Sequence, residues 1–221
     1  MKDHKNLTPA TLTPELALDL LKQGNQRFLN NLSKNRNHLE VVNETKDGQK
    51  PFAAILSCMD SRTAAELIFD QGLGDIFSIR IAGNIANEDI LGSLEFATAA
   101  AGSKLILVLG HTGCGAVKGA CDNVELGNLT GLLQKIRPSV DEETKTQGDR
   151  SSKNIDFVNE VASINVKNTV KDIVAKSDTI RGLIENGTIG IAAAMYDVAT
   201  GEVSFHDEHA ILPSRKQEAV A

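Results

Sequence analysis

Short apolar runs alternate with longer amphipathic segments along most of the chain. Three of these runs, at residues 52–56, 76–81 and 105–109, lack the polar residue at every second position that marks a half-exposed strand. Runs of this kind are typical of parallel sheets with both faces covered. Helical segments are expected between them, at 64–69 and 89–101. The order strand, helix, strand, helix, strand predicts a parallel sheet with right-handed crossovers.

The rest of the chain continues this alternation. A helix is expected from about residue 114, and the apolar segment 188–196 predicts a further central strand after the helix stop Asn186-Gly187. The turn Thr200-Gly201 predicts that residues 202–205 return as an edge strand. Further helices are expected at 129–136, 155–176 and 177–186, and a polar surface loop at 138–154. We therefore predict an α/β fold with a mostly parallel central β-sheet flanked by helices.

The N-terminal segment predicts a helical arm ahead of this sheet. Thr13-Pro14-Glu15 combines a capping hydroxyl, a proline at the first helical position and an acid near the positive end of the helix dipole. Apolar residues then recur four apart, and we expect this stripe to pack on the main body or on a second subunit. The stripe consists of Leu16, Leu20, Gly24 and Phe28. Residues 31–50 are polar and are expected to form a loop.

Length and composition predict a single domain. The 221 residues can build one sizeable core but not two large ones. The 41% of hydrophobic residues and 24% of charged residues fit a soluble globular protein. Within this domain we expect an N-terminal helical arm and loop at 1–48, an α/β core at 49–206 and a tail at 207–221.

Charge and segment lengths argue against several classes of partner. The formal net charge is −6, so nucleic acid and acidic lipid would not be attracted electrostatically. The chain has no run of about 18 apolar residues, so we expect no membrane span. The start Met1-Lys2-Asp3-His4 leads into polar residues rather than an apolar signal core. Three cysteines cannot all pair within one chain, and we expect a location in the reducing cytoplasm.

Two segments with metal-binding residues follow the first and third predicted strands. Cys58 comes directly after the first strand, and His111 and Cys114 come directly after the third. Ligands of open parallel sheets bind beyond the carboxyl ends of the strands, so the two segments are expected to converge there. The His-x-x-Cys spacing lets one tight turn deliver an imidazole and a thiolate to one ion. Gly113 and Gly115 keep that turn free of side-chain bulk.

Two thiolates and one imidazole favour Zn²⁺, one ion per chain, bound in the core at 49–206. Three protein ligands leave a fourth tetrahedral position for water, which indicates a catalytic site rather than a structural one. Asp60 lies two residues from Cys58, close enough to accept a hydrogen bond from a zinc-bound hydroxide and to orient it. Asp60 would also be a competent zinc ligand, and Arg62 can prevent this by clamping the carboxylate in a two-pronged ion pair.

Each candidate ligand also has an ordinary structural interpretation. A buried cysteine is by itself more often a small hydrophobic residue, and a lone histidine is more often a hydrogen-bonded structural residue. The joint arrangement at two strand ends favours the metal site over these alternatives. Cys121, two helical turns beyond Cys114, is interpreted as a packing residue. His206 and His209 are interpreted as part of a solvated surface rather than as a second metal site.

The two metal-binding segments resemble the motifs of the β-class carbonic anhydrases. Residues 58–62, Cys-Met-Asp-Ser-Arg, are similar to the family's Cys-x-Asp-Ser-Arg motif, and residues 110–115, Gly-His-Thr-Gly-Cys-Gly, to its Gly-His-x-x-Cys-Gly motif. The resemblance extends from about Gly24 to Val203. It implies reversible hydration of CO₂ to bicarbonate and a proton by attack of zinc-bound hydroxide. It also implies a homodimer embraced by the N-terminal arm, often paired into a dimer of dimers.

The resemblance further implies a set of substrate-binding residues. The plant-like subclass has a glutamine nine residues before the first cysteine ligand, which reaches into the site from a dimer neighbour, and Gln49 matches it. Phe77 matches an apolar residue of the substrate pocket, and Phe96 stands where that subclass commonly has tyrosine. Gly115, the last residue of the second motif, is assigned to the same pocket.

A second subclass is inhibited by bicarbonate, which it binds with a tryptophan, an arginine and a tyrosine. Arg80 and Tyr196 match two of these residues, but Ile55 stands at the tryptophan position. We therefore expect an incomplete inhibitory site. Near neutral pH we expect an open zinc position, with Asp60 held away from the metal by Arg62.

Two other functions are compatible with the same residues. Related enzymes hydrolyse CS₂ or COS with the same ligands, and motifs separate these small linear substrates poorly from CO₂. A zinc-stabilised structural or interaction domain is the non-enzymatic alternative. It predicts four protein ligands, usually with cysteines in closely spaced pairs, whereas this chain has three cysteines in total.

Overall fold

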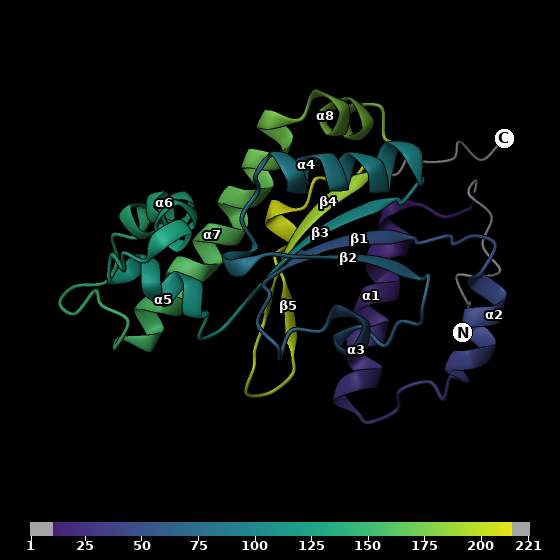
Figure 1. The fold of residues 1–221 in the computed structure, drawn as a ribbon, viewed down its shortest axis with the longest axis horizontal. Coiled ribbons are helices and arrows are strands. Elements are labelled where there is room, and N and C mark those ends of the chain that lie inside the picture. The colour runs from purple at the N-terminus through teal and green to yellow at the C-terminus, as the bar shows by residue number, and fades with distance from the viewer. Residues whose placement is uncertain (1–10, 214–221) are drawn as a thin grey trace, which may run out of the picture.

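The computed structural model describes residues 11–213, so the sequence-based expectations for residues 1–10 and 214–221 lie outside the described part. Five strands form one sheet in the order β2-β1-β3-β4-β5. The first four pair in parallel, and β5 is antiparallel to β4 (Figure 1). The strands are β1 (Ala53–Ser57), β2 (Ile76–Arg80), β3 (Leu105–His111), β4 (Gly190–Tyr196) and β5 (Val203–Phe205). The α/β fold with a mostly parallel sheet is confirmed.

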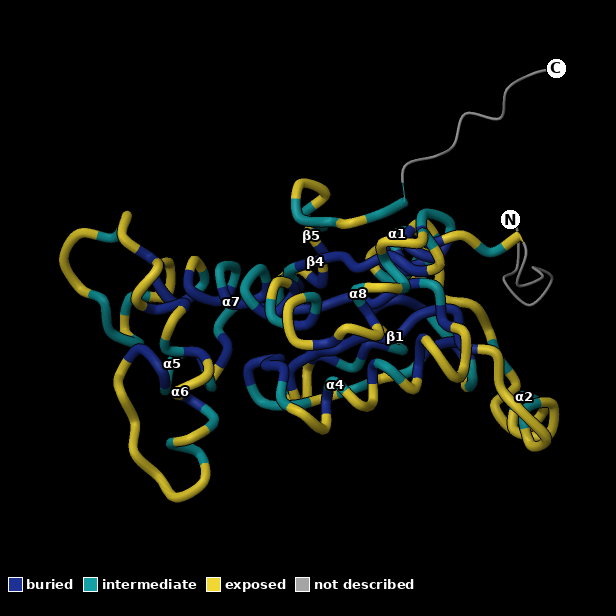
Figure 2. The backbone as a smooth tube through the Cα atoms, turned by 90° about the horizontal axis from the view of Figure 1, so that it is seen from above, coloured by how far each residue is buried: buried dark blue, intermediate teal, exposed yellow. Residues whose placement is uncertain are grey.

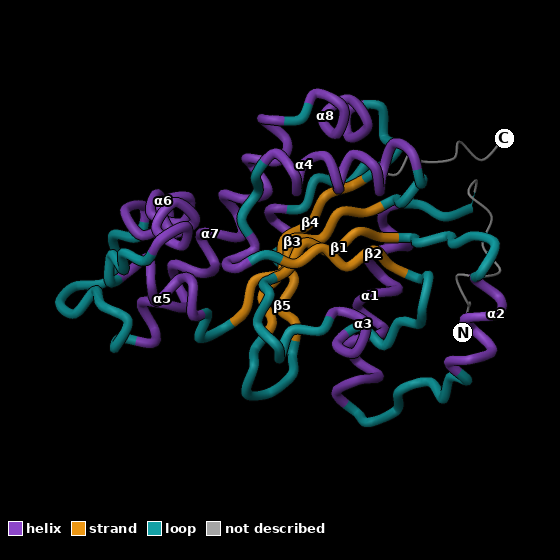
Figure 3. Tube along the Cα trace, in the orientation of Figure 1, coloured by secondary structure: helices purple, strands orange, loops and turns teal. Residues whose placement is uncertain are grey.

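Helices cover both faces of the sheet, as Figures 1 and 3 show. One face packs against α1 (Pro14–Leu29) and α3 (Ala65–Ile68), and the other against α4 (Glu88–Glu95), α7 (Ile155–Lys176) and α8 (Asp178–Glu185). A π-helical turn, Phe96–Ala100, extends α4. Beyond the carboxyl ends of the strands, α5 (Gly115–Cys121) and α6 (Gly127–Glu142) pack against the start of α7 around a third apolar cluster.

Burial differs between the central strands and the edge strand β2. Every residue of β1 and β3 is buried, as the apolar runs predicted, and dark blue runs through these strands in Figure 2. β2 lies at the edge and exposes Ser78 and Arg80, so the expectation of two covered faces is wrong for this strand. The reason is its position at the edge of the sheet, where the covering helices leave Ser78 and Arg80 open to solvent.

The structure extends helical regions into two segments that were expected to be loops. Residues 31–50 contain α2 (His38–Thr45), which begins where the Asn37 side chain accepts a hydrogen bond from the Glu40 N–H at 3.4 Å. Helix α6 continues to Glu142 through Pro138, although a loop was expected from residue 138. Val140 is buried in the apolar cluster under α6, and this packing outweighs the proline's missing N–H.

The predicted start of α1 is confirmed, but its buried face is not the predicted stripe. The Thr13 hydroxyl accepts a hydrogen bond from the Leu16 N–H at 3.2 Å. The buried residues are Pro14, Ala17, Leu18, Leu21, Gly24 and Asn25, whereas Leu16, Leu20 and Phe28 are half-buried at its flanks. A Cβ at Gly24 would lie 1.8 Å from the Phe69 carbonyl oxygen, so α1 packs tightly on its own body. No helix among the described residues is long and apolar enough to span a membrane.

Candidate metal centre

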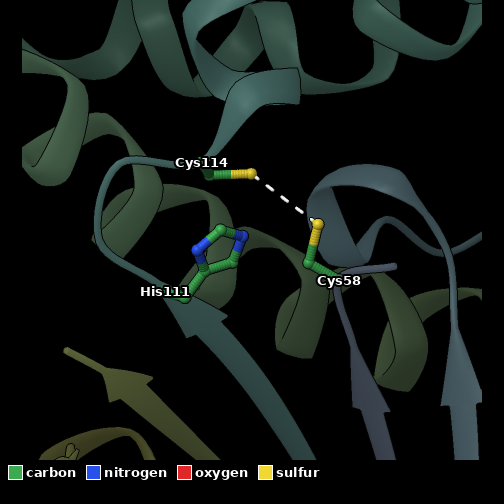
Figure 4. Close-up of side chains that lie close together, drawn as sticks. All are labelled: Cys58, His111 and Cys114. Atoms are coloured by element: carbon green, nitrogen blue, oxygen red, sulfur yellow. Dashed lines mark hydrogen bonds between the residues drawn. The ribbon is translucent and has the colours of Figure 1, made fainter. Parts of the chain in front are cut away.

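The parallel register of β1 and β3 brings the three predicted ligands together. Ser57, the last residue of β1, pairs with Leu109 of β3, so Cys58 follows β1 beside the end of β3. His111 is the last residue of β3, and Cys114 caps α5. Figure 4 shows the three side chains pointing toward one another from these strand ends. All three are buried, with at most 4% of each exposed.

The distances between the ligand atoms fit a tetrahedral metal ion. The sulfur atoms of Cys58 and Cys114 are 3.9 Å apart, and all three ligand atoms lie within 4.8 Å of one another. Two sulfurs bound at about 2.3 Å to a tetrahedral ion would be about 3.8 Å apart. His111 Nδ1 is 3.0 Å from the Thr112 carbonyl oxygen, and its Nε2 is buried without a partner. With Nδ1–H donating to that carbonyl, Nε2 is left with a lone pair for a metal.

The charges of the two cysteines depend on each other. The pKa of the Cys58 thiol is lowered to about 4, mainly because the Cys114 thiol donates a hydrogen bond to its sulfur, although burial opposes this. The pKa of Cys114 is raised because it donates this bond, because it is buried and because the Cys58 charge disfavours a second one. The hydrogen bond between the two sulfurs thus lowers the pKa of one thiol and raises that of the other, and a bound cation would favour the thiolate form of both. This donor set of two sulfurs and one imidazole suits Zn²⁺.

Asp60 and Arg62 form the expected two-pronged ion pair. Arg62 Nε lies 2.9 Å from Asp60 Oδ1, and Arg62 Nη2 lies 2.7 Å from Oδ2. The Arg62 backbone N–H also donates to Oδ1, at 3.0 Å. These bonds hold the pKa of Asp60 well below its usual range. Asp60 is not among the clustered ligand atoms, and its carboxylate pairs with Arg62 instead.

Two further side chains, Arg80 and Thr63, hold the segment that carries Cys58 and Asp60. The Thr63 hydroxyl lies 2.9 Å from the carbonyl oxygens of both Cys58 and Asp60. The Arg80 guanidinium donates to the same two oxygens, with Nε 3.2 Å from that of Cys58. Sequence reasoning missed the role of Thr63, whose only sequence signal is its position directly after the motif. It considered Arg80 only as part of an incomplete bicarbonate site, which remains a prediction.

Helix α7 holds the other ligand-bearing segment. Gly113, in the turn between His111 and Cys114, donates its N–H to Asn159 Oδ1 at 2.8 Å. Its φ of +64° is a conformation that favours glycine, which supports the expected role of this residue in the turn. Gly115 is different, because it is exposed and a Cβ there would meet nothing within 4 Å. Asn159 lies 45 residues beyond Cys114, and no local pattern connects it to the site.

The predicted substrate-binding residues, apart from Gly115, do not lie beside the metal ligands of their own chain. Gln49 is exposed and precedes β1, so it lies at the opposite end of that strand from Cys58. It lines a hollow of about 630 Å³. Phe77 and Phe96 contact each other edge to face, with ring centroids 6.2 Å apart, and line a hollow of about 570 Å³ beside β2.

The remaining cysteine and the C-terminal histidines are separate from the cluster. Cys121 is buried in the apolar cluster between α5, α6 and α7, and burial raises its pKa to about 11, in line with packing. His206 and His209 are both half-buried, and His206 Nε2 is buried without a partner, so the expected solvated surface is only partly correct. Between residues 11 and 213, Cys58, His111 and Cys114 are the single group with metal-ligand geometry.

Comparisons with known proteins place these features in a family. A carbonic anhydrase family model matches residues 53–203. Carbonic anhydrase 2 of Mycobacterium tuberculosis is 36% identical over 202 residues, which cover 88% of this chain and 93% of that protein. The β-carbonic anhydrase CcaA superposes with a TM-score of 0.67 at 25% identity, covering 84% of this chain and 86% of that one.

A tetrameric β-carbonic anhydrase of Sordaria macrospora has the same fold, with a TM-score of 0.66 at 22% identity, covering 87% of this chain and 94% of that one. The family model spans more than half of the chain, and the mycobacterial relative aligns over nearly all of it. Together with the sheet order and the cluster at its carboxyl end, these likenesses show that the chain belongs to the β-class carbonic anhydrases, a family of enzymes.

Proposed function

We propose that this enzyme catalyses the reversible hydration of CO₂ to bicarbonate and a proton, with one Zn²⁺ per chain held by Cys58, His111 and Cys114. The observation that carries the proposal is the arrangement of five side chains. Three ligand atoms lie within 4.8 Å of one another, while the nearby Asp60 carboxylate is tied to Arg62. This arrangement provides three protein ligands and leaves a fourth position for water, as catalytic zinc sites do.

Zinc in this site would supply a Lewis acid that lowers the pKa of water at its fourth position toward neutrality. The chain's own residues supply orientation and charge. Asp60 accepts a hydrogen bond from the nucleophile and aims its lone pair at the carbon of CO₂. Arg62 donates a hydrogen bond to each oxygen of Asp60, and this holds the carboxylate away from the fourth coordination position of the metal. The low pKa of Asp60 keeps it an acceptor at neutral pH.

We propose that a second copy of the chain completes the substrate pocket with Gln49, Phe77 and Phe96. In support, these residues lie at the β2 edge and the amino end of the sheet, away from their own chain's ligands. Helix α2 supports the same assembly, because none of its residues is buried and it exposes Leu39 and Val42. The Sordaria macrospora enzyme is described as tetrameric, which fits a dimer of dimers.

A cytoplasmic location is part of the proposal. The two sulfur ligands must remain unpaired to bind a metal, and a reducing compartment preserves them in that state.

The experiment combines zinc stoichiometry with stopped-flow CO₂ hydration on the wild type, Cys114→Ala and the matched control Cys121→Ala. We expect about one zinc per chain and activity in the wild type and in Cys121→Ala, because Cys121 only packs. Cys114→Ala should lose both metal and activity. Activity of a metal-free Cys114→Ala protein would overturn the proposal. H₂S release from CS₂ without CO₂ hydration would reassign the substrate.

A further inference from the structure

A backbone N–H in the loop after β2 points at one of the metal-binding sulfurs. The Gly83 N–H donates to Cys58 Sγ with a nitrogen–sulfur distance of 3.4 Å. Gly83 adopts a φ of +66°, and a Cβ at this position would lie 2.5 Å from Ile136 Cδ1. Both the left-handed conformation and the crowding require glycine here. The Gly83 N–H is therefore held in a loop whose backbone has a positive φ at both Gly83 and Asn84, and the crowding at Ile136 admits only glycine at the first of these positions.

The peptide unit that follows Gly83 is held at both ends. Its carbonyl oxygen accepts a hydrogen bond from Asn165 Nδ2 at 2.8 Å, and its N–H, which belongs to Asn84, donates to the Ile81 carbonyl oxygen at 3.0 Å. Asn165 lies on α7 and is only 2% exposed. A buried bond of this kind is costly to break, because the carbonyl would be left without a partner.

Helix α7 can place Asn165 because the helix approaches the sheet closely. A Cβ at Gly110 in β3 would lie 2.4 Å from Val166 Cγ2, so the glycine leaves room for α7 directly over the ligand-bearing strand. The contact at Val166 fixes the neighbouring Asn165 relative to β3 and to the loop at Gly83. A chain of contacts therefore runs from β3 through α7 to the Gly83 loop, and from there to the Cys58 sulfur.

We propose that Asn165 is a positioning residue that aims the Gly83 N–H at the Cys58 thiolate and thereby limits how much charge this sulfur donates to the metal. The inference rests on the proposed zinc site. Two thiolates together neutralise a divalent ion, which weakens its action on water. A hydrogen bond to a sulfur withdraws electron density from it and leaves more positive charge on the metal.

The first experiment uses the protein loaded with Co²⁺, whose thiolate-to-metal charge-transfer band reports the electron density on sulfur. Asn165→Leu should shift this band to longer wavelength, because a sulfur without its N–H donor gives up an electron more easily. The variant should also lose Co²⁺ to a chelator about 10-fold faster, because the released Gly83 loop no longer holds the Cys58 sulfur in position, and this loss of orientation outweighs the stronger donation by the sulfur.

Asn168→Leu is the matched control. Asn168 lies on the same helix but bonds to Ser139 Oγ at 3.1 Å and Glu142 Oε2 at 2.7 Å, on α6. The charge-transfer band of Asn168→Leu, and the rate at which this variant loses Co²⁺ to the chelator, should equal those of the wild type. A folded Asn165→Leu protein with the wild-type band would overturn the inference and leave the zinc site intact. A wild type that binds Co²⁺ without any thiolate band would instead overturn the zinc site itself.

A second measurement needs no variant and therefore does not depend on whether Asn165→Leu folds. In wild-type protein loaded with ¹¹³Cd²⁺, a hydrogen bond to a metal-bound sulfur transmits a scalar coupling from cadmium to the amide proton. We expect such a coupling at the amide of Gly83 and none at the amide of Asn84, which donates to a carbonyl. A Gly83 amide without coupling to cadmium would contradict the proposed contact.

Discussion

The two ends of the sheet are built differently. At the carboxyl end, the side chains of Cys58, His111 and Cys114 are buried. Thr63, Arg80 and Asn159 bond to the backbone of the segments that carry them, and Asn165 bonds to the neighbouring Gly83 loop. At the amino end, Gln49 is exposed and α2 buries none of its residues. Figure 2 shows the strands in dark blue and the coil of α2 mostly in yellow.

We interpret this contrast as a division between the metal site, which one chain forms, and the substrate pocket, for which we propose that two chains are needed. A metal site demands fixed distances, and the chain supplies them through side-chain bonds to the backbone of both ligand segments. At the β2 edge the single chain leaves Phe96 61% exposed and Phe77 half-buried, which agrees with the proposal that a second copy completes a substrate pocket there. We therefore expect changes at the carboxyl end to affect chemistry within one chain, and changes at the amino end to act through assembly.

The largest expected effect is at the carboxyl end. Asp60→Asn should retain zinc but lower kcat/KM for CO₂ hydration by about 10²–10⁴-fold, because the amide cannot accept and orient the nucleophile's hydrogen bond as the carboxylate does. Asp141→Asn is the control, since Asp141 pairs with Arg137 on the exposed side of α6 at 3.0 Å. Stopped-flow kinetics and metal analysis measure both. Near-normal kcat/KM in Asp60→Asn would remove Asp60 from the mechanism.

The next effect concerns stability rather than chemistry. Asp70 is buried and accepts hydrogen bonds from Arg27 on α1 and from Arg36, which leads into α2. Asp70→Asn should lower the free energy of unfolding by about 3 kcal/mol, because two partly buried arginines lose their buried counter-charge. The exposed pair of Lys22 and Asp207 provides the control, and Asp207→Asn should cost less than about 1 kcal/mol.

The Asp70→Asn variant should also change how stability depends on pH. Burial raises the pKa of Asp70, but the bonds from Arg36 and Arg27 outweigh it and hold the pKa below its ordinary value. Stability from a carboxylate with a lowered pKa is present above its unfolded pKa of about 3.9 and is lost as the pH falls below that value. Denaturant unfolding from pH 7 to pH 3 should therefore show a steeper acid loss in the wild type than in Asp70→Asn. Parallel curves would contradict the assignment.

A smaller effect is expected at the amino end. Leu39 and Val42 on α2 are 81% and 50% exposed in the single chain. If α2 packs on a second copy, Leu39→Ser with Val42→Ser should weaken dimerisation by about 2 kcal/mol, or about 30-fold. Sedimentation equilibrium measures this change, and zinc content should stay constant. Leu126→Ser, at an equally exposed position beside α6, should leave dimerisation unchanged.

The smallest effect tests whether the pocket is shared. Gln49→Ala should lower kcat/KM about 10-fold, which corresponds to the loss of one hydrogen bond of about 1.4 kcal/mol. Mixing it with metal-free Cys114→Ala chains should raise activity above the average of the two proteins, since a hybrid dimer combines an intact metal site with an intact Gln49. Activity equal to that average would place each pocket within one chain.

Local patterns were enough to predict most of the fold. Buried strands, caps and turns each leave a signature within about ten residues, so the strands and the start of α1 were found close to their observed positions. The sequence-based predictions were wrong where contacts between residues far apart in the chain determine the length of a helix or its buried face. Val140 keeps α6 helical beyond Pro138, and the contact of Gly24 with Phe69 selects which face of α1 is buried.

The sequence by itself predicted the clustering of Cys58, His111 and Cys114, the Asp60–Arg62 pair and the end of the sheet at which they meet. It could do so because the ligands lie within a few residues of strand ends and parallel strands bring those ends together. Only the tertiary structure decided that Asn159 holds the turn between His111 and Cys114 and that Asn165 holds the Gly83 loop. It also decided that Gln49, Phe77 and Phe96 lie away from the three clustered side chains. These relations join residues separated by tens of positions, and packing of helix on sheet creates them without any repeating pattern along the chain.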